Sequence, residues 1–356
     1  MNGDGKPDLV SANWSDWEDP DAGPSTVSLL LNEGDGTFEP ERAYPTGPGA
    51  VSVAVADVNG DGALDVGTGS GASFGCAAIA TASVLLNRGD GTLGPKHKYR
   101  TGRCPTVALG DLDGDGRPEL VTGNDVSNTV SVLHNRADGT FAPRRDYRVE
   151  EPASLSIGDL NHDGRQDVAS ATENAGPSAI DVLFNRGRKG FWHRSYVAGD
   201  SSTAVVIDDM SGDGKPDLGY VNEFDAVSVR VNVGGGSFLP RSSYTAPGRA
   251  WGPTSLATSD LNGDGRRDLA VANVFSSKVT VFLNTPGLCN VQRVGGKTLV
   301  VARRRLARLN CRVGKVRRAY SKQMLAGRVI SQKPAFGAVR PGGGKVDLVL
   351  SLGRRR

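Results

Sequence analysis

One nine-residue acidic pattern recurs along most of the chain and constrains its fold more than any other feature. A shortened copy, NGDGKPD, occupies residues 2–8. Successive complete copies begin 54, 48, 50 and 51 residues apart. A period of about 50 residues is typical of solenoids and β-propellers. The complete copies are residues 57–65 (DVNGDGALD), 111–119 (DLDGDGRPE), 159–167 (DLNHDGRQD), 209–217 (DMSGDGKPD) and 260–268 (DLNGDGRRD).

The segments between these copies also repeat, and they alternate between apolar runs and turns. Each copy leads into a run such as DLVSAN or ELVTGN, and a second run ends in Asn, as in VSLLLN and VSVLHN. A turn such as GDGTF, a Tyr-bearing segment such as RAYPTG and a small-residue run such as TVALGD complete the unit. Short apolar runs bounded by Gly, Asn and Asp are typical of β-strands. Four strands in about 50 residues predict one blade of a β-propeller.

Charge is distributed unevenly and indicates two domains. Residues 286–356 hold 18 of the 42 Lys and Arg residues and one acidic residue, Asp347, which gives a net charge of +17. The whole chain carries +3, so residues 1–285 carry −14. We therefore expect a repeat domain over residues 1–285 and a basic domain over residues 286–356, with different partners. No apolar run reaches the length of about 18 residues that a membrane-spanning helix needs.

The acidic pattern and the Asp-Gly-Thr-Phe turn resemble the FG-GAP/VCBS repeat, the blade type of integrin α-subunit heads, over residues 1–285. The resemblance implies an all-β fold, a β-propeller in which six repeats are visible, with Ca²⁺ in the acidic loops. With the strands of each blade ordered A, acidic loop, B, C and D, the first repeat lacks strand A. The sixth repeat ends at Asn284 and lacks strand D.

Closure of the ring leaves two alternatives open. Met1 occupies position 2 of its loop, where Met210 stands in another copy, so we expect an internal methionine, missing upstream sequence and a seven-bladed ring. In the other alternative, residues 1–44 complete the blade that begins at Thr254, and the ring has six blades.

The acidic loops are the candidate metal sites. A hard divalent cation prefers about six to eight oxygen ligands. Positions 1, 3, 5 and 9 supply side-chain oxygens, position 7 offers a carbonyl, and Gly at position 6 permits the turn. The resemblance implies Ca²⁺, and ligation by oxygen alone favours Ca²⁺ over Zn²⁺. The alternative is that the loops are Asp-Gly turns without metal. The predicted ligands are Asp57, Asn59, Asp61, Asp65; Asp111, Asp113, Asp115, Glu119; Asp159, Asn161, Asp163, Asp167; Asp209, Ser211, Asp213, Asp217; Asp260, Asn262, Asp264, Asp268; and, in the incomplete copy, Asn2, Asp4, Asp8.

The basic segment predicts a small α+β module. Apolar residues at helical spacing predict a helix over residues 298–310, and strands are expected over 312–317, 327–331 and 345–352. The segment resembles a PASTA domain, found on penicillin-binding proteins and bacterial Ser/Thr kinases, through VGGKTL near its start, GRVISQKP in its centre and KVDLVLS near its end. The apolar helix residues are Leu299, Val300, Ala302, Leu306 and Leu309.

The PASTA resemblance implies a bacterial source and binding to peptidoglycan or β-lactams. The charge of +17 favours anionic wall polymers or lipid head groups, with a merely solvated basic surface as the alternative. Nucleic acid is not expected, because no aromatic stacking platform accompanies the Arg residues. We expect residues 286–356, rather than the propeller, to hold the protein at the cell wall.

Four cysteines allow three connectivities. Cys289 and Cys311 flank the predicted helix, whereas Cys76 and Cys104 fall in loops on one face of the propeller. We expect disulfides between Cys76 and Cys104 and between Cys289 and Cys311, and hence an oxidising compartment. Buried free thiols are the alternative.

The expected function is that of a calcium-stabilised binding or adhesion protein, extracellular or at the cell surface. Enzymatic activity is not expected, because no Ser-His-Asp or Cys-His arrangement is evident. Trp14, Trp17 and Trp251 lie in or beside loops on the face opposite the acidic loops, where the integrin-like family binds ligands, so a protein or glycan ligand is expected there. The alternatives are a lectin-like carbohydrate binder and a non-catalytic part of a secreted polysaccharide-acting enzyme.

Overall fold

The computed structural model describes residues 1–15, 24–47, 49–70, 80–172, 178–199, 201–222, 226–245, 252–274, 276–285, 289–307, 311–340 and 344–354. The chain separates into two units, Met1–Phe282 and Leu283–Arg356. Hydrophobic clusters form within each of them.

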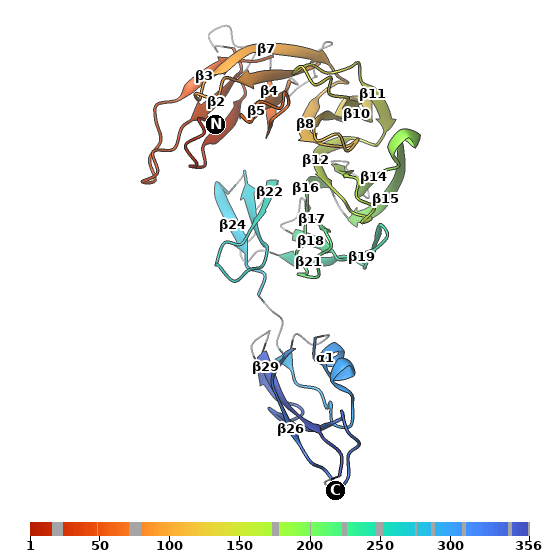
Figure 1. The fold of residues 1–356 in the computed structure, drawn as a ribbon. Helices are drawn as coiled ribbons and strands as arrows, with labels where there is room; N and C mark the ends of the chain where they lie inside the picture. The colour runs from red at the N-terminus through yellow and green to blue at the C-terminus, as the bar shows by residue number, and fades with distance from the viewer. Residues whose placement is uncertain are drawn as a thin grey trace. The chain divides into compact units, whose positions relative to one another are not determined.

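Small antiparallel sheets make up the first unit and follow one another around an arc (Figure 1). The first sheet contains β1 (Leu9–Asn13), β2 (Thr26–Leu30) and β3 (Arg42–Pro45). Four four-stranded sheets follow: β4 (Ala50–Ala56), β5 (Asp65–Ser70), β6 (Thr81–Asn87) and β7 (Leu93–Arg100); β8 (Pro105–Gly110), β9 (Glu119–Asn124), β10 (Thr129–Leu133) and β11 (Arg145–Arg148); β12 (Pro152–Gly158), β13 (Asp167–Thr172), β14 (Ser178–Asn185) and β15 (Phe191–Gly199); and β16 (Ser202–Asp208), β17 (Asp217–Asn222), β18 (Ala226–Arg230) and β21 (Ser242–Thr245). The sixth sheet contains β22 (Pro253–Ser259), β23 (Asp268–Asn273) and β24 (Lys278–Phe282). Shorter elements are the hairpin β19 (Asn232–Gly234) and β20 (Ser237–Phe238), and the 3-10 turns η1 (Asp125–Ser127) and η2 (Gly187–Lys189).

This architecture confirms the predicted all-β repeat domain, because each sheet corresponds to one sequence repeat. The first and sixth sheets have three strands each, as the phasing of the repeats predicts. The first strands of successive sheets (β4, β8, β12, β16 and β22) contact one another, as the inner strands of propeller blades do. Ring closure and blade number stay predictions. Within the described residues, no hydrophobic cluster joins the first and sixth sheets.

The core of the first unit lies between neighbouring sheets. The second strand of four sheets (β5, β9, β13 and β17) is buried at every residue, because a neighbouring sheet covers each of its faces. Small residues permit this close approach. At Gly69 in β5, an added Cβ would lie 2.1 Å from the backbone oxygen of Pro105 in β8.

Aromatic pairs join three successive sheet boundaries. Each pair combines a Tyr from the last strand of one sheet with a Phe from the turn or strand that follows the third strand of the next. The rings meet edge to face, a geometry worth about 0.5–1.5 kcal/mol beyond burial. These contacts explain why the Tyr-bearing segment and the Phe of the turn recur together. The pairs are Tyr99–Phe141, Tyr147–Phe191 and Tyr196–Phe238, with ring centroids 5.3, 4.9 and 5.0 Å apart.

The second unit is a three-stranded sheet with one helix, which confirms the predicted α+β module. The sheet order is β26-β29-β27, with β26 parallel to β29 and β27 antiparallel to it, and the helix contacts β26. The elements are β25 (Cys289–Asn290), α1 (Leu299–Ala307), β26 (Cys311–Ala319), β27 (Val329–Lys333), β28 (Val339–Arg340) and β29 (Gly344–Ser351).

The helix α1 contains four of the five apolar residues whose spacing predicted it, and three of these four face the core. Ala302 and Leu306 are fully buried and Leu299 packs against the same core, but Val300 is 69% exposed. One residue turns an α-helix by about 100°, which carries Val300 away from the face that the other three residues share. Leu309 lies outside the described residues.

Candidate functional site

Each complete acidic loop connects the first and second strands of its sheet, and its first carboxylate organises the turn. Asp57 Oδ1 accepts the N–H of Gly60 at 2.7 Å, and its Oδ2 accepts the N–H of Gly62 at 2.8 Å. Gly62 has a φ of +86°, a conformation that glycine adopts without strain. The contact from the glycine at position 6 recurs, at 2.7–2.9 Å, in the loops that begin at Asp111, Asp159, Asp209 and Asp260.

The side chains at positions 3 and 5 hold the rest of the loop. In the second repeat, Asn59 Oδ1 accepts the N–H of Asp61 at 3.0 Å, and Asp61 Oδ1 accepts the N–H of Ala63 at 2.8 Å. An ionised carboxylate has lone pairs on both oxygens, so these contacts leave acceptor capacity for a cation.

The carboxylate at position 9 is buried beneath each loop. Asp167, for example, accepts the N–H of Leu160 at 3.0 Å and that of Asn185, the last residue of β14, at 2.8 Å. Asp65 and Glu119 make the corresponding two contacts in their repeats. The five carboxylates with no exposed surface are Asp65, Glu119, Asp167, Asp217 and Asp268.

Burial shifts the titration of these groups. Desolvation raises the pKa of Glu119 and of Asp167 to about 7, against the lowering effect of their backbone hydrogen bonds. The pKa of Asp65 and of Asp217 is raised for the same reason. Carboxylates at other positions of the same loop contribute to each rise, so the loops concentrate negative charge around a buried acid.

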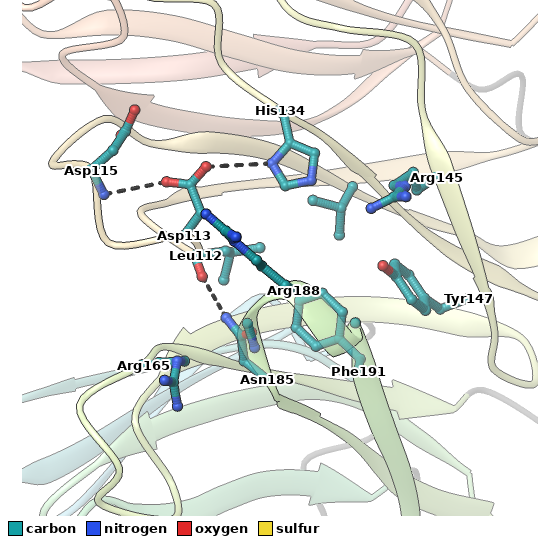
Figure 2. Close-up of a pocket in the computed structure, with 13 residues that line it drawn as sticks. Leu112, Asp113, Asp115, His134, Arg145, Tyr147, Arg165, Asn185, Arg188 and Phe191 are labelled. Carbon is teal, nitrogen blue, oxygen red and sulfur yellow. Dashed lines mark hydrogen bonds and ion pairs between the residues drawn. The ribbon is translucent and has the colours of Figure 1, made fainter.

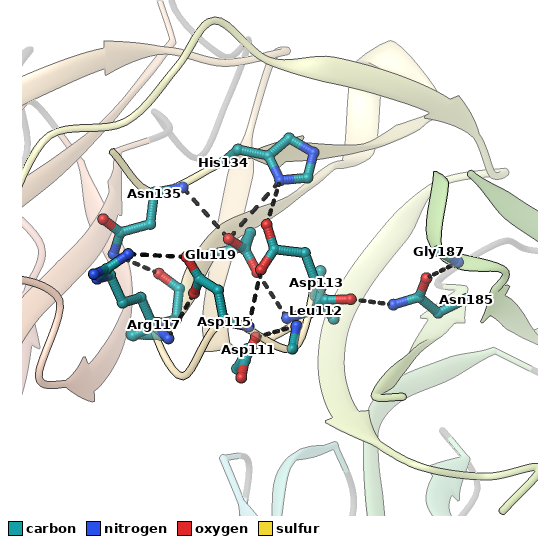
Figure 3. Close-up of polar contacts among 12 residues, drawn as sticks. Asp111, Leu112, Asp113, Asp115, Arg117, Glu119, His134, Asn135, Asn185 and Gly187 are labelled. Carbon is teal, nitrogen blue, oxygen red and sulfur yellow. Dashed lines mark hydrogen bonds and ion pairs between the residues drawn. The ribbon is translucent and has the colours of Figure 1, made fainter. Parts of the chain in front are cut away.

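The third loop gathers the most carboxylates. One oxygen from each of Asp111, Asp113 and Asp115 lies within 4.8 Å of the others, and Asp113, Glu119 and His134 form a second such group (Figure 3). The other complete loops carry Asn or Ser at position 3. His134 was not among the site residues predicted from the sequence. The available signal was a polar residue at a position that is apolar in the other repeats.

The incomplete first loop keeps part of this arrangement. Asp8 accepts the N–H of Asn32 at 2.8 Å, and it pairs with the amino group of Met1 at 2.5 Å. It therefore occupies the place that the position-9 carboxylates take in the complete loops.

A pocket of about 560 Å³ lies beside the third loop (Figure 2). Asp113 and His134 line it from the third repeat, and Tyr147 of β11 and Phe191 of β15 form an aromatic wall. Its cationic side chains are Arg145, Arg165 and Arg188. Sequence reasoning missed this pocket because its walls come from two successive repeats.

The predicted ligand-face residues are described only in part. Trp14 directly follows β1 and is 46% exposed. Trp17 and Trp251 lie outside the described residues.

A Ser, a His and an Asp also meet on the fourth sheet, beside a second pocket of about 370 Å³. His193 Nε2 lies 2.8 Å from Asp181 Oδ1 and 3.3 Å from Ser195 Oγ, and Ser195 also donates to Asp181. A catalytic triad needs the Asp and the Ser at opposite ring nitrogens. Here one nitrogen faces both, so this group lacks the triad arrangement.

Two of the cysteines can be placed. Cys104 precedes β8 and Cys311 begins β26, and neither is a free thiol. Cys76 and the side chain of Cys289 lie outside the described structure, so the two pairings stay predictions.

The profile of the FG-GAP-like repeat family matches residues 1–68, 111–170, 159–219 and 209–271, more than half of the chain. The chain belongs to the FG-GAP-like repeat family. The PASTA profile matches residues 290–352 of this FG-GAP-like repeat protein. Both predicted resemblances are thereby confirmed. Both families are non-catalytic and typical of extracellular or surface proteins.

Solved structures resemble the FG-GAP-like repeat protein at low sequence identity. A protein of unknown function from Desulfotomaculum acetoxidans is 15% identical, with a TM-score of 0.51 over 72% of this chain and 75% of that chain. A lectin from Agrocybe aegerita that recognises non-reducing terminal N-acetylglucosamine is 20% identical, with a TM-score of 0.49 over 77% and 80%. The Tc holotoxin pore of Photorhabdus luminescens is 20% identical, with a TM-score of 0.42 over 79% of this chain and 13% of that chain. The first of these shows a shared fold.

A search of curated proteins found no match. None of the helices in the described ranges has the length and apolar character needed to cross a membrane.

Proposed function

We propose that this protein is an extracellular, non-catalytic binding protein. Ca²⁺ bound in the acidic loops stabilises its repeat domain, which presents a ligand-binding surface, and its PASTA domain associates with the cell wall. The observation that carries the Ca²⁺ assignment is the burial of a carboxylate at position 9 of all five complete loops.

The donor set fits Ca²⁺. A buried carboxylate surrounded by further carboxylates is unfavourable without a counter-charge, and desolvation of an ion costs several kcal/mol. In the second repeat, Asp57, Asn59, Asp61 and Asp65 would hold the ion through oxygen, which hard cations prefer. The equivalent residues of the loops in the fourth, fifth and sixth repeats would do the same. Bound Ca²⁺ supplies charge neutralisation, and the protein residues fix the loop at the end of its sheet.

We propose two surfaces for ligand binding on the repeat domain. The first is the face that carries Trp14, Trp17 and Trp251, for a protein or glycan. The second is the pocket beside the third loop, whose volume of about 560 Å³ and whose Tyr147 and arginine side chains favour the lectin-like alternative. A glycan array, probed with the wild-type chain and with Tyr147→Ala, distinguishes the two proposed binding surfaces. Binding that is lost in Tyr147→Ala assigns the pocket, and glycan binding that survives this substitution assigns another surface.

We further propose that the PASTA domain provides wall association through charge. Arg303, Arg304 and Arg305 of α1 are exposed, within a segment of net charge +17. Attraction to anionic polymers is long-range and weakens with salt, because the Debye length falls from about 10 Å at 0.1 M to about 3 Å at 1 M. Recognition of the glycan itself would survive high salt.

The test is co-sedimentation of the full chain with purified wall, with and without its anionic polymer, across a salt series. Replacing Arg303, Arg304 and Arg305 with Gln should reduce sedimentation at low salt. The matched control replaces Arg88, Lys98 and Arg100 of the repeat domain with Gln. This control should sediment with the wall as the wild type does. Equal loss in both variants contradicts the assignment to the PASTA domain.

A further inference from the structure

The third repeat departs from the other five at three positions that meet in space. Position 3 of its loop is Asp113, where the other repeats carry Asn or Ser. Position 9 is Glu119, where all the others carry Asp. The residue before Asn135 is His134, whereas the residue before the corresponding Asn of each other repeat is apolar. Those apolar residues are Leu31, Leu86, Phe184, Val231 and Leu283.

The three side chains converge, but His134 does not form a direct hydrogen bond with either carboxylate. His134 Nδ1 lies 3.7 Å from Asp113 Oδ2 and 3.8 Å from Glu119 Oε1 (Figure 3). Both distances exceed that of a hydrogen bond. In the same protein, His193 forms an ordinary direct pair with Asp181 at 2.8 Å. His134 is thus held almost equally far from two carboxylates.

This spacing suits three ligands of one small cation. Ligand atoms about 2.0–2.2 Å from a Zn²⁺ ion, at tetrahedral to trigonal angles, lie about 3.3–3.8 Å apart. Imidazole nitrogen is a ligand of Zn²⁺ and similar transition metal ions, whereas Ca²⁺ takes oxygen. Asp113 and His134 also line the pocket of Figure 2, which gives an ion a route from solvent.

We propose that the third repeat selects a divalent transition metal ion of the Zn²⁺ class, bound by Asp113, Glu119 and His134, while the other complete loops bind Ca²⁺. The inference rests on the proposed function only in that both assign cations to the acidic loops. Each of the three residues differs from its counterpart in the other repeats in a way that favours binding of such an ion. Asp113 adds a carboxylate, Glu119 extends the reach of the buried acid, and His134 adds nitrogen.

The test is calorimetric titration of the untagged full chain with Zn²⁺ in the presence of saturating Ca²⁺. The wild-type chain should bind one Zn²⁺ ion. His134→Leu restores the residue found at this place in three other repeats and should weaken binding by at least about 10–100-fold, the loss seen even when only a supporting residue is removed. Asp113→Asn restores the residue of position 3 elsewhere and should also weaken it.

The matched control is His193→Leu, because His193 is as exposed as His134 but pairs directly with its carboxylate. The His193→Leu variant should bind Zn²⁺ with the same affinity as the wild-type chain. Substitution with Co²⁺ adds a spectroscopic readout, since the visible absorption of the bound ion should change when its nitrogen ligand is lost. Absence of Zn²⁺ binding to the wild-type chain, or unchanged binding by His134→Leu, overturns the proposal.

Melting with and without Ca²⁺ separates this inference from the proposed function. His134→Leu should keep most of the Ca²⁺-induced rise in melting temperature. Stoichiometric Zn²⁺ binding without any effect of Ca²⁺ contradicts the Ca²⁺ proposal and supports the third site. A Ca²⁺-induced rise in melting temperature without Zn²⁺ binding supports the Ca²⁺ proposal and contradicts the third-repeat site.

Discussion

Asn232 Nδ2 donates a hydrogen bond of 2.7 Å to the backbone oxygen of Leu160, which belongs to the acidic loop of the preceding repeat. The same amide donates to Pro216 O in its own loop at 2.8 Å. The backbone N–H of Asn232 also donates to Asp217, the buried acid of that loop, at 2.7 Å. One side chain therefore joins two successive loops. The equivalent contacts to a preceding loop run from Asn87 to Met1, from Asn135 to Val58 and from Asn185 to Leu112.

Replacing Asn232 with Ala should destabilise the repeat domain by about 2–4 kcal/mol. Two hydrogen bonds are lost, and two carbonyls are left unsatisfied in a buried place. The measurement is the denaturation midpoint of the chain in chelator. The control, Asn262→Ala in chelator, removes an exposed Asn and should cost less than about 1 kcal/mol. Equal losses in the two variants would contradict a role for this contact.

Without metal, acidification should stabilise the repeat domain between about pH 7 and pH 5. Glu119 and Asp167 bind protons more tightly when folded, because their pKa is raised to about 7. Stability from such groups is complete below the unfolded pKa of about 4 and is lost as pH rises through the folded pKa. One pKa unit corresponds to about 1.4 kcal/mol, so a shift of about three units contributes at most about 4 kcal/mol for each group.

Melting in chelator at pH 8, 7, 6 and 5.5 measures this effect, and repeating the series in Ca²⁺ is the control. The ion stabilises the ionised carboxylates, so its advantage should shrink toward pH 5.5. Asp35, Asp90 and Asp138 have a lowered pKa from hydrogen bonds with Thr and titrate below this window. A fall in the chelator melting temperature from pH 8 to pH 5.5 would count against the account.

The protein should contain disulfides between Cys76 and Cys104 and between Cys289 and Cys311. The second would close a loop of about 21 residues and contribute roughly 3 kcal/mol in the chain-entropy model. Peptide mapping under non-reducing conditions identifies the pairs. Cross-linked peptides that join the two units, or native thiols open to alkylation at all four positions, would refute this pairing.

Much of the fold was predictable, because it depends on local patterns. Turn residues and apolar runs located the strands, and the acidic pattern located the loops between first and second strands. Contacts between repeats were not predictable. Asn232 looks like an ordinary residue at the end of a strand, and only the neighbouring repeat brings Leu160 O to it. His134 likewise acquires its meaning from Glu119, which is 15 residues away in sequence and adjacent in space. Val300 fits helical spacing but lies off the face that the sheet covers.

The most direct measurement of the central claim is the melting temperature of the repeat domain during a Ca²⁺ titration, with bound ions counted by calorimetry. Binding to the folded state alone adds about 2.7 kcal/mol per site at a hundredfold excess over Kd. We predict a rise of many degrees over chelator, and Asp264→Ala should lose part of it. Asp138→Ala, an exposed acid outside the loops, should keep the whole rise. An unchanged melting temperature in excess chelator, or an undiminished Ca²⁺ response of Asp264→Ala, would contradict the account.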